Sequence, residues 1–140
     1  MDIYRAWQQY CATQLQTIDI CLHAKKRMRM RAWEEFKDLT RWEVLNLIRT
    51  GRLIEAASSL DSRTFHVEII FSQSKICIVI HADINQLTTV KNEQYNYDPE
   101  VFAKLPVWEQ TRLRKQTKAY HRELEARYLR GDFRRRVFNF

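Results

Sequence analysis

Glycine and proline are scarce in this chain, which has two of each among 140 residues. Because these residues punctuate turns, their scarcity favours long helices over a β architecture with many turns. With only Gly51 and Gly131, the chain has no glycine-rich loop to cradle phosphates, and it has no GxSxG motif for a nucleophilic serine. These absences exclude loop-based nucleotide hydrolases and α/β-hydrolases. The sequence therefore favours a non-enzymatic protein with no catalytic residue, no metal site and no cofactor.

Cysteine is also sparse, and long apolar runs are missing. Cys11, Cys21 and Cys77 include no CxxC pair and leave an odd number, which is typical of free thiols in a reducing compartment. The longest apolar run, ICIVI at 76–80, is far shorter than the roughly 20 residues of a transmembrane helix. No signal peptide follows Met1, since no apolar block comes after Arg5. We expect a soluble protein of the cytoplasm or another reducing intracellular compartment, without a transmembrane segment.

The length fits one folded domain. We assign residues 1–131 to a single α+β domain and residues 132–140 to a basic, aromatic C-terminal tail. A spacing of three and four residues is shared by Tyr4, Trp7, Cys11, Leu15, Ile18 and Leu22. This spacing predicts one long amphipathic helix at the N-terminus.

The segment from Asp38 to Asp61 predicts a pair of helices. Thr40 and Glu43 have the spacing of a capping box, and Gly51 suits the positive φ that ends many helices. A second short helix over 52–60 completes an αα-hairpin. Such a hairpin resembles a DNA-reading helix-turn-helix, and GRLIEAA also resembles one turn of a helical repeat.

The period of the apolar residues then changes from 3.6 to 2. Alternation in TFHVEIIF (64–71) and KICIVIHA (75–82) predicts a β-hairpin connected through 72–74. A hairpin alone is marginally stable, so we expect its apolar face to pack on the helices, with a third strand near 87–90. The fold class is therefore α+β, mainly helical, with a small antiparallel sheet.

The C-terminal part predicts a long basic helix. Asp98 and Pro99 begin it, Pro106 restarts it after a bend, and Gly131 ends it. One side of this helix is expected to be lined by Leu105, Trp108, Tyr120, Leu124 and Tyr128.

Positive charge is concentrated in this helix and the tail. Residues 112–136 contain ten Lys or Arg and three Asp or Glu, whereas the rest of the chain has fourteen of each sign. A second cluster, KKRMRMR, lies at 25–31. A localised basic surface indicates an acidic partner, which can be nucleic acid, an anionic membrane or an acidic protein face, and of these we expect nucleic acid, RNA or DNA. The predicted contact residues are Lys25, Lys26, Arg27, Arg29, Arg31, Arg114, Lys115, Lys118, Arg122, Arg130, Arg134, Arg135 and Arg136.

Alternatives to nucleic-acid binding remain open. Phe138 and Phe140 predict an anchored tail, on this chain, on a second copy or on a protein partner, and such docking would suit an adaptor or assembly subunit. Arg114 and His121, with six residues between them, resemble the motif of the higher-eukaryote and prokaryote nucleotide-binding ribonucleases, which implies RNA cleavage across a helical dimer. The pairs His66 with Glu68 and His81 with Asp83 either converge on a metal or form a solvated sheet face.

Overall fold

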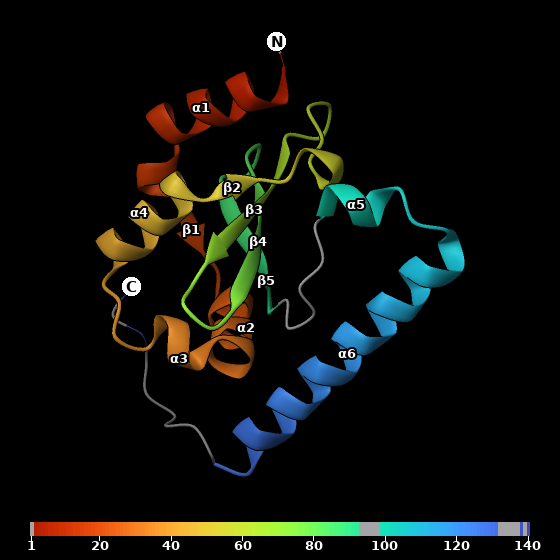
Figure 1. The fold of residues 1–140 in the computed structure, drawn as a ribbon. Helices are drawn as coiled ribbons and strands as arrows, with labels where there is room; N and C mark the ends of the chain where they lie inside the picture. Colours follow the sequence, from red (N-terminus) through yellow and green to blue (C-terminus); the bar gives the residue numbers. More distant parts are fainter. Residues whose placement is uncertain (1, 93–98, 132–137, 139) are drawn as a thin grey trace.

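The computed structural model describes residues 2–92, 99–131, 138 and 140 of the chain (Figure 1). Within these residues, six α-helices accompany a five-stranded mixed sheet, so the α+β class is confirmed. The helices are α1 (Ile3–Thr13), α2 (Leu22–Arg31), α3 (Trp33–Phe36), α4 (Arg41–Thr50), α5 (Pro99–Ala103) and α6 (Val107–Leu129), and two short 3-10 turns are η1 (Leu15–Thr17) and η2 (Glu55–Ala57).

The sheet has the strand order β1-β5-β4-β3-β2. The strands are β1 (Asp19–Ile20), β2 (Arg52–Leu53), β3 (Thr64–Ile70), β4 (Lys75–His81) and β5 (Gln86–Asn92). Only β1 and β5 run parallel, and the other pairs are antiparallel. The predicted hairpin is confirmed as β3 and β4, and the predicted third strand as β5.

One face of the sheet forms the core together with α1 to α4. Val67, Ile78 and Val90 lie in register across the three long strands, and all three are fully buried. Period-2 alternation places every second side chain of β3 and β4 on this face, and a register shift opposite Val79 and Ile80 lets both Leu87 and Val90 of β5 be buried. Trp7 and Tyr10 of α1 close one end of the core against β3.

The prediction of one long N-terminal helix is wrong, because α1 ends at Thr13 and the chain turns into β1. Ile18 and Ile20 are both buried, as alternating residues of an extended segment. The backbone N–H of Asp19 donates to the carbonyl of Asn85 (3.0 Å), and β1 then pairs with the start of β5. Pairing with a distant strand thus overrides the local helical spacing.

The predicted αα-hairpin is also wrong. The capping box of Thr40 and Glu43 is confirmed at the start of α4, but Arg52 and Leu53 form β2, and only the 3-10 turn η2 follows. The resemblance to a helix-turn-helix therefore fails. Gly51 has φ −70°, so it does not end α4 with a positive φ. Glycine is needed there because a Cβ would lie 2.6 Å from Cγ1 of Val67.

The C-terminal part follows the sequence expectation more closely. Pro106 precedes α6, and Gly131 after it has φ +82°, a conformation that glycine adopts freely. Asp98, the expected cap of the first turn, lies outside the described residues.

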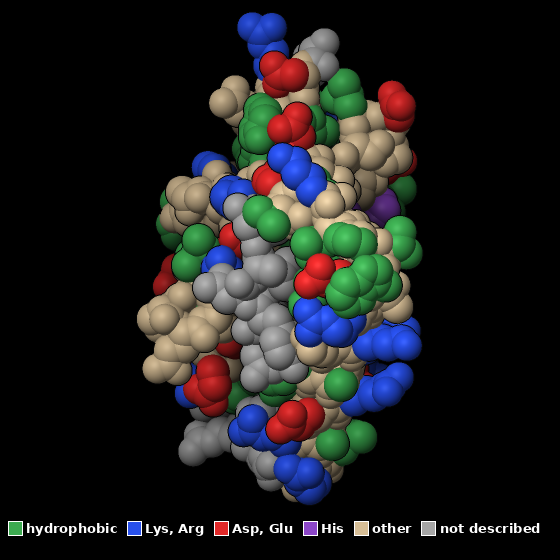
Figure 2. All heavy atoms as spheres, turned by 45° about the vertical axis from the view of Figure 1, so that its right-hand side comes forward, with side chains coloured by type: hydrophobic (Ala, Val, Ile, Leu, Met, Phe, Trp, Pro, Cys, Tyr) green, Lys and Arg blue, Asp and Glu red, His purple; other side chains and the backbone are tan. Residues whose placement is uncertain are grey.

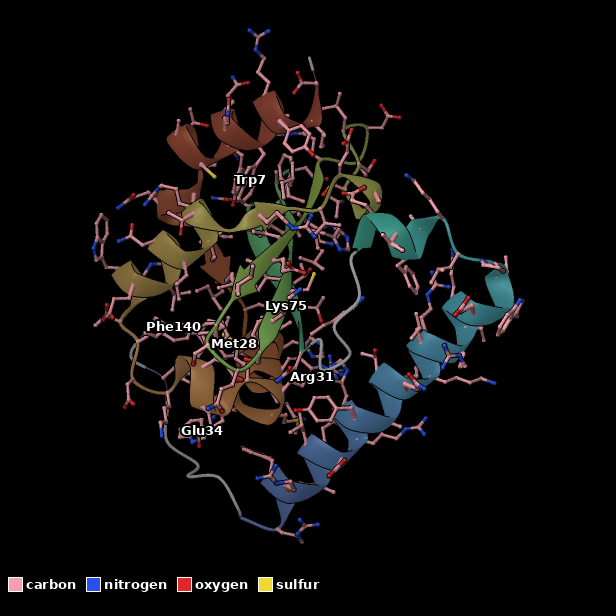
Figure 3. All side chains as sticks on the ribbon, viewed as in Figure 1. Trp7, Met28, Arg31, Glu34, Lys75 and Phe140 are labelled. Atoms are coloured by element: carbon pink, nitrogen blue, oxygen red, sulfur yellow. The ribbon has the colours of Figure 1, made fainter. Side chains whose placement is uncertain are left out.

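The end of the chain is anchored within the same molecule, next to α3 (Figures 1 and 3). Phe138 is only 6% exposed, and its ring centroid lies 5.4 Å from that of Trp33. Phe140 lies 6.4 Å from Phe36 and stacks on Phe138 at 5.1 Å. The anchoring predicted for these two aromatic residues is therefore internal.

Candidate nucleic-acid interface

Helix α6 attaches to the body of the protein through α2 and the open edge of β5. Leu124 and His121 are its buried side chains. The backbone N–H of Asn92, beyond the residues of β5 that pair with β1, donates to Nε2 of His121 (3.1 Å). The side-chain amide of Asn92 then donates to the carbonyl of Arg31 in α2 (2.7 Å). These bonds satisfy polar groups that would otherwise be buried without a partner.

Two of the predicted nucleic-acid contacts hold α2 against α6. Arg27 and Arg31 form ion pairs with Glu125 of α6 at 3.1 and 3.6 Å, and Arg31 also donates to the carbonyl of Val90 (3.0 Å). Figure 3 shows Arg31 on the α6 side of α2. The basic residues at 25–31 therefore do not form one exposed surface, because Arg27 and Arg31 face α6. Lys26 is exposed, whereas Lys25 and Arg29 are half-buried.

The opposite side of α6 carries charge that the fold does not use. Lys115, Lys118 and Arg122 are exposed, and they form no ion pair within the described part of the chain. Helical residues seven apart lie within about 20° of one line, so Lys115 and Arg122 are aligned with Lys118 between them. Of the three acidic residues on α6, Glu109 pairs with Arg112 (3.4 Å), Glu125 faces α2 and Glu123 is exposed.

Trp108 belongs to this same outward side, contrary to the sequence expectation that it packs with Leu124. It is 67% exposed. Trp108 and Leu124 are 16 residues apart, which places them about 160° apart around a helix. Trp108 is instead seven residues before Lys115. We call Trp108, Lys115, Lys118 and Arg122 the outward stripe of α6. Figure 2, in which this side of the molecule comes forward, shows basic and apolar side chains next to one another.

The other predicted basic contacts have varied positions. Arg114 is exposed, with its guanidinium carbon 5.4 Å from the ring centroid of Phe102 in α5. Arg130 is exposed directly after α6. Arg134, Arg135 and Arg136 lie outside the described residues. The outward stripe is thus the part of the predicted surface with the clearest geometry.

His121 has a structural position. Burial, with Arg31 nearby, lowers its pKa to about 4 from an ordinary value near 6.5. The imidazole is therefore neutral at pH 7, and its Nε2 lone pair accepts the Asn92 hydrogen bond. Arg114 is exposed, whereas His121 is buried and its Nε2 accepts the hydrogen bond of Asn92, so the two side chains differ in their access to solvent; the ribonuclease resemblance stays a prediction.

The buried neutral state of His121 predicts pH-dependent stability. Above about pH 6.5 the imidazole is neutral in both the folded and the unfolded chain. As the pH falls towards 4, the unfolded chain takes up the proton first, so the free energy of unfolding decreases. We expect His121→Gln, which retains an acceptor for Asn92, to show a smaller loss between pH 7 and 5 in urea denaturation. Part of the loss persists because His66 has a similarly lowered pKa. Equal losses in the variant and the parent protein would contradict this role.

The histidines of the sheet lie on its face away from the core. His66 and Glu68 are two residues apart on β3 and share this face, and Glu68 pairs with Arg52 of β2 at 3.5 Å. His81 is opposite Thr64 at the end of β4, and Asp83 follows in the turn. No group of three or more His, Cys, Asp or Glu in the described residues is arranged to hold a metal ion.

None of the described helices combines the length and the apolar character needed to cross a membrane.

Comparison with known proteins adds no further constraint: no family model, no curated protein and no solved structure matches this chain. The sequence predicted the basic residues of α6 but missed Trp108 as their neighbour. The seven-residue spacing to Lys115 is the signal that could have found it.

Proposed function

We propose that this chain is a non-enzymatic nucleic-acid-binding protein that uses the outward stripe of α6. The observation that carries the proposal is the set of three neighbouring cations on one side of α6, Lys115, Lys118 and Arg122, exposed and without ion pairs among the described residues. Because these cations form no ion pair in the described part of the chain, they leave positive charge suited to a phosphate backbone.

The alternative of an adaptor docking through its aromatic tail has less support. Phe138 and Phe140 already pack on Trp33 and Phe36 of the same chain. A partner that captured these rings would have to displace this packing first. No comparable internal use exists for the three cations of the outward stripe in the described residues.

The proposal is tested by replacing Lys115, Lys118 and Arg122 together with Gln. In fluorescence anisotropy with labelled RNA and DNA oligonucleotides, we expect the parent protein to bind at low salt and the variant to bind more weakly. The plot of log K against log salt should become shallower by about 2 on single strands and by nearly 3 on B-DNA, because each of the three phosphate contacts contributes roughly 0.7 and 0.9 respectively. The melting temperature should stay unchanged because these side chains are exposed.

A matched control removes three positive charges elsewhere. Arg5, Lys37 and Arg63 lie on α1, after α3 and before β3, and their replacement by Gln changes the net charge equally. Because Lys37 pairs with Glu34 (2.9 Å) and Arg63 donates to Gln14 (2.8 Å), a thermal melt of the control must show that it stays folded. If the two triple variants lose affinity to the same extent, the interaction depends on net charge alone and the stripe is not the site. Absence of binding by the parent protein at low salt would refute nucleic-acid binding altogether.

A further inference from the structure

We propose that Trp108 is a base-stacking residue of the outward stripe, and that the nucleic acid bound there is single-stranded. This inference rests on the proposed function and specifies its ligand. Trp108 is 67% solvent-accessible at the start of α6, beside the exposed Val107. Trp108 and Val107 together leave an apolar surface exposed at the start of α6, next to the cations of the outward stripe.

The position of Trp108 relative to the cations supports a shared ligand. Trp108, Lys115 and Arg122 follow one another at seven-residue intervals, so they lie nearly in line over a length of about 21 Å. Lys118 lies next to this line. An aromatic ring at one end of a row of cations is the combination by which proteins hold single strands, with bases on the ring and phosphates on the cations.

An exposed tryptophan ring favours a single strand over a duplex as the ligand. The bases of a duplex are paired and stacked on each other, so a ring can reach their faces only by insertion between steps, which unstacks and kinks the helix. The bases of a single strand are free to stack on an exposed ring without that energetic cost. Each base of either RNA or DNA has such a face, so this contact requires no particular sequence.

The chain provides a matched control in Trp42. Trp42 is 58% exposed, but it lies on α4, with the guanidinium of Arg49 at 6.0 Å from its ring centroid. Its neighbours are thus different from those of Trp108, while the two side chains are equally dispensable for the core. Neither Trp108→Ala nor Trp42→Ala is expected to unfold the protein, and thermal melts verify this.

The experiment measures affinities of the parent protein, Trp108→Ala, Trp108→Phe and Trp42→Ala for a 20-nucleotide single strand and for the duplex of the same sequence, at one fixed low salt concentration. We expect Trp108→Ala to weaken single-strand binding by roughly 5-fold to 100-fold, the range that one base–aromatic stack contributes. Trp108→Phe should restore most of this loss, and Trp42→Ala should bind as the parent does. Duplex affinity should change less than twofold in all variants.

The possible outcomes distinguish a failure of the stacking role from a failure of the proposed nucleic-acid binding. If neither oligonucleotide binds the parent protein, the proposed function fails and the stacking role fails with it. If the parent binds and Trp108→Ala binds equally well, only the stacking role is refuted. Tighter duplex binding that depends on Trp108 would replace stacking with insertion. In a parallel measurement with anionic phospholipid vesicles, a Trp108-dependent affinity in the absence of oligonucleotide binding would assign the stripe to a membrane surface instead.

Discussion

Trp7→Ala is expected to lower the free energy of unfolding by about 3–5 kcal/mol, the usual cost of removing a buried aromatic side chain. Trp7 is 6% exposed, and its ring centroid lies 5.6 Å from that of Tyr10 and 5.2 Å from that of Phe65. Alanine leaves a cavity where α1 meets β3. Because Tyr10 and Phe65 also contact each other at 5.7 Å, the cavity cannot close without disturbing that pair.

Urea denaturation at pH 7 measures this loss, and Trp42→Ala is the control. Trp42 is an exposed tryptophan, so its truncation should change the free energy of unfolding by no more than about 0.5 kcal/mol. A loss for Trp7→Ala as small as that of the control would show that α1 does not contribute to the cooperative core.

The hairpin of β3 and β4 could be predicted because apolar residues recur at every second position of two seven-residue segments. The strand β5 was expected only as a third partner for this hairpin, near 87–90. The two short strands could not be predicted. Two residues, such as Asp19 and Ile20, have no measurable period, and β1 and β2 exist through pairing with β5 and β3. The apolar spacing before β1 predicted a continuing helix, and Gly51 before β2 predicted a turn between two helices. Pairing with distant strands determines the structure at both places instead.

At the candidate site, too, some features follow from the local sequence and others depend on contacts between distant residues. Local charge density identified α6 as the basic element, because ten cations in 25 residues are visible in the sequence. Which cations remain available depends on contacts between distant residues. Arg27 and Glu125 are 98 positions apart, and no local pattern announces their ion pair. Helical geometry, in contrast, is sufficient to place Trp108 opposite Leu124 and in line with Lys115 from the sequence alone.

The second large loss of stability is expected from the two aromatic residues that anchor the end of the chain. We expect the double variant Phe138→Ala with Phe140→Ala to lose several kcal/mol of unfolding free energy, since truncation of one buried Phe alone costs about 3–5 kcal/mol. Phe138 fills a position against Trp33, and Phe140 covers Phe36, so both rings complete the core where α3 meets the sheet.

Leu129→Ala is the matched control for this variant, because Leu129 is a large apolar residue of the same C-terminal region that is 66% exposed. It should leave the melting temperature nearly unchanged. Sedimentation of the double variant beside its thermal melt then distinguishes an internal from an external anchor. An internal anchor predicts a lower melting temperature with the same mass as the parent protein. A variant that melts like the parent but sediments at a lower mass would show that the two rings join copies of the chain, because the loss would then appear in assembly and not in folding.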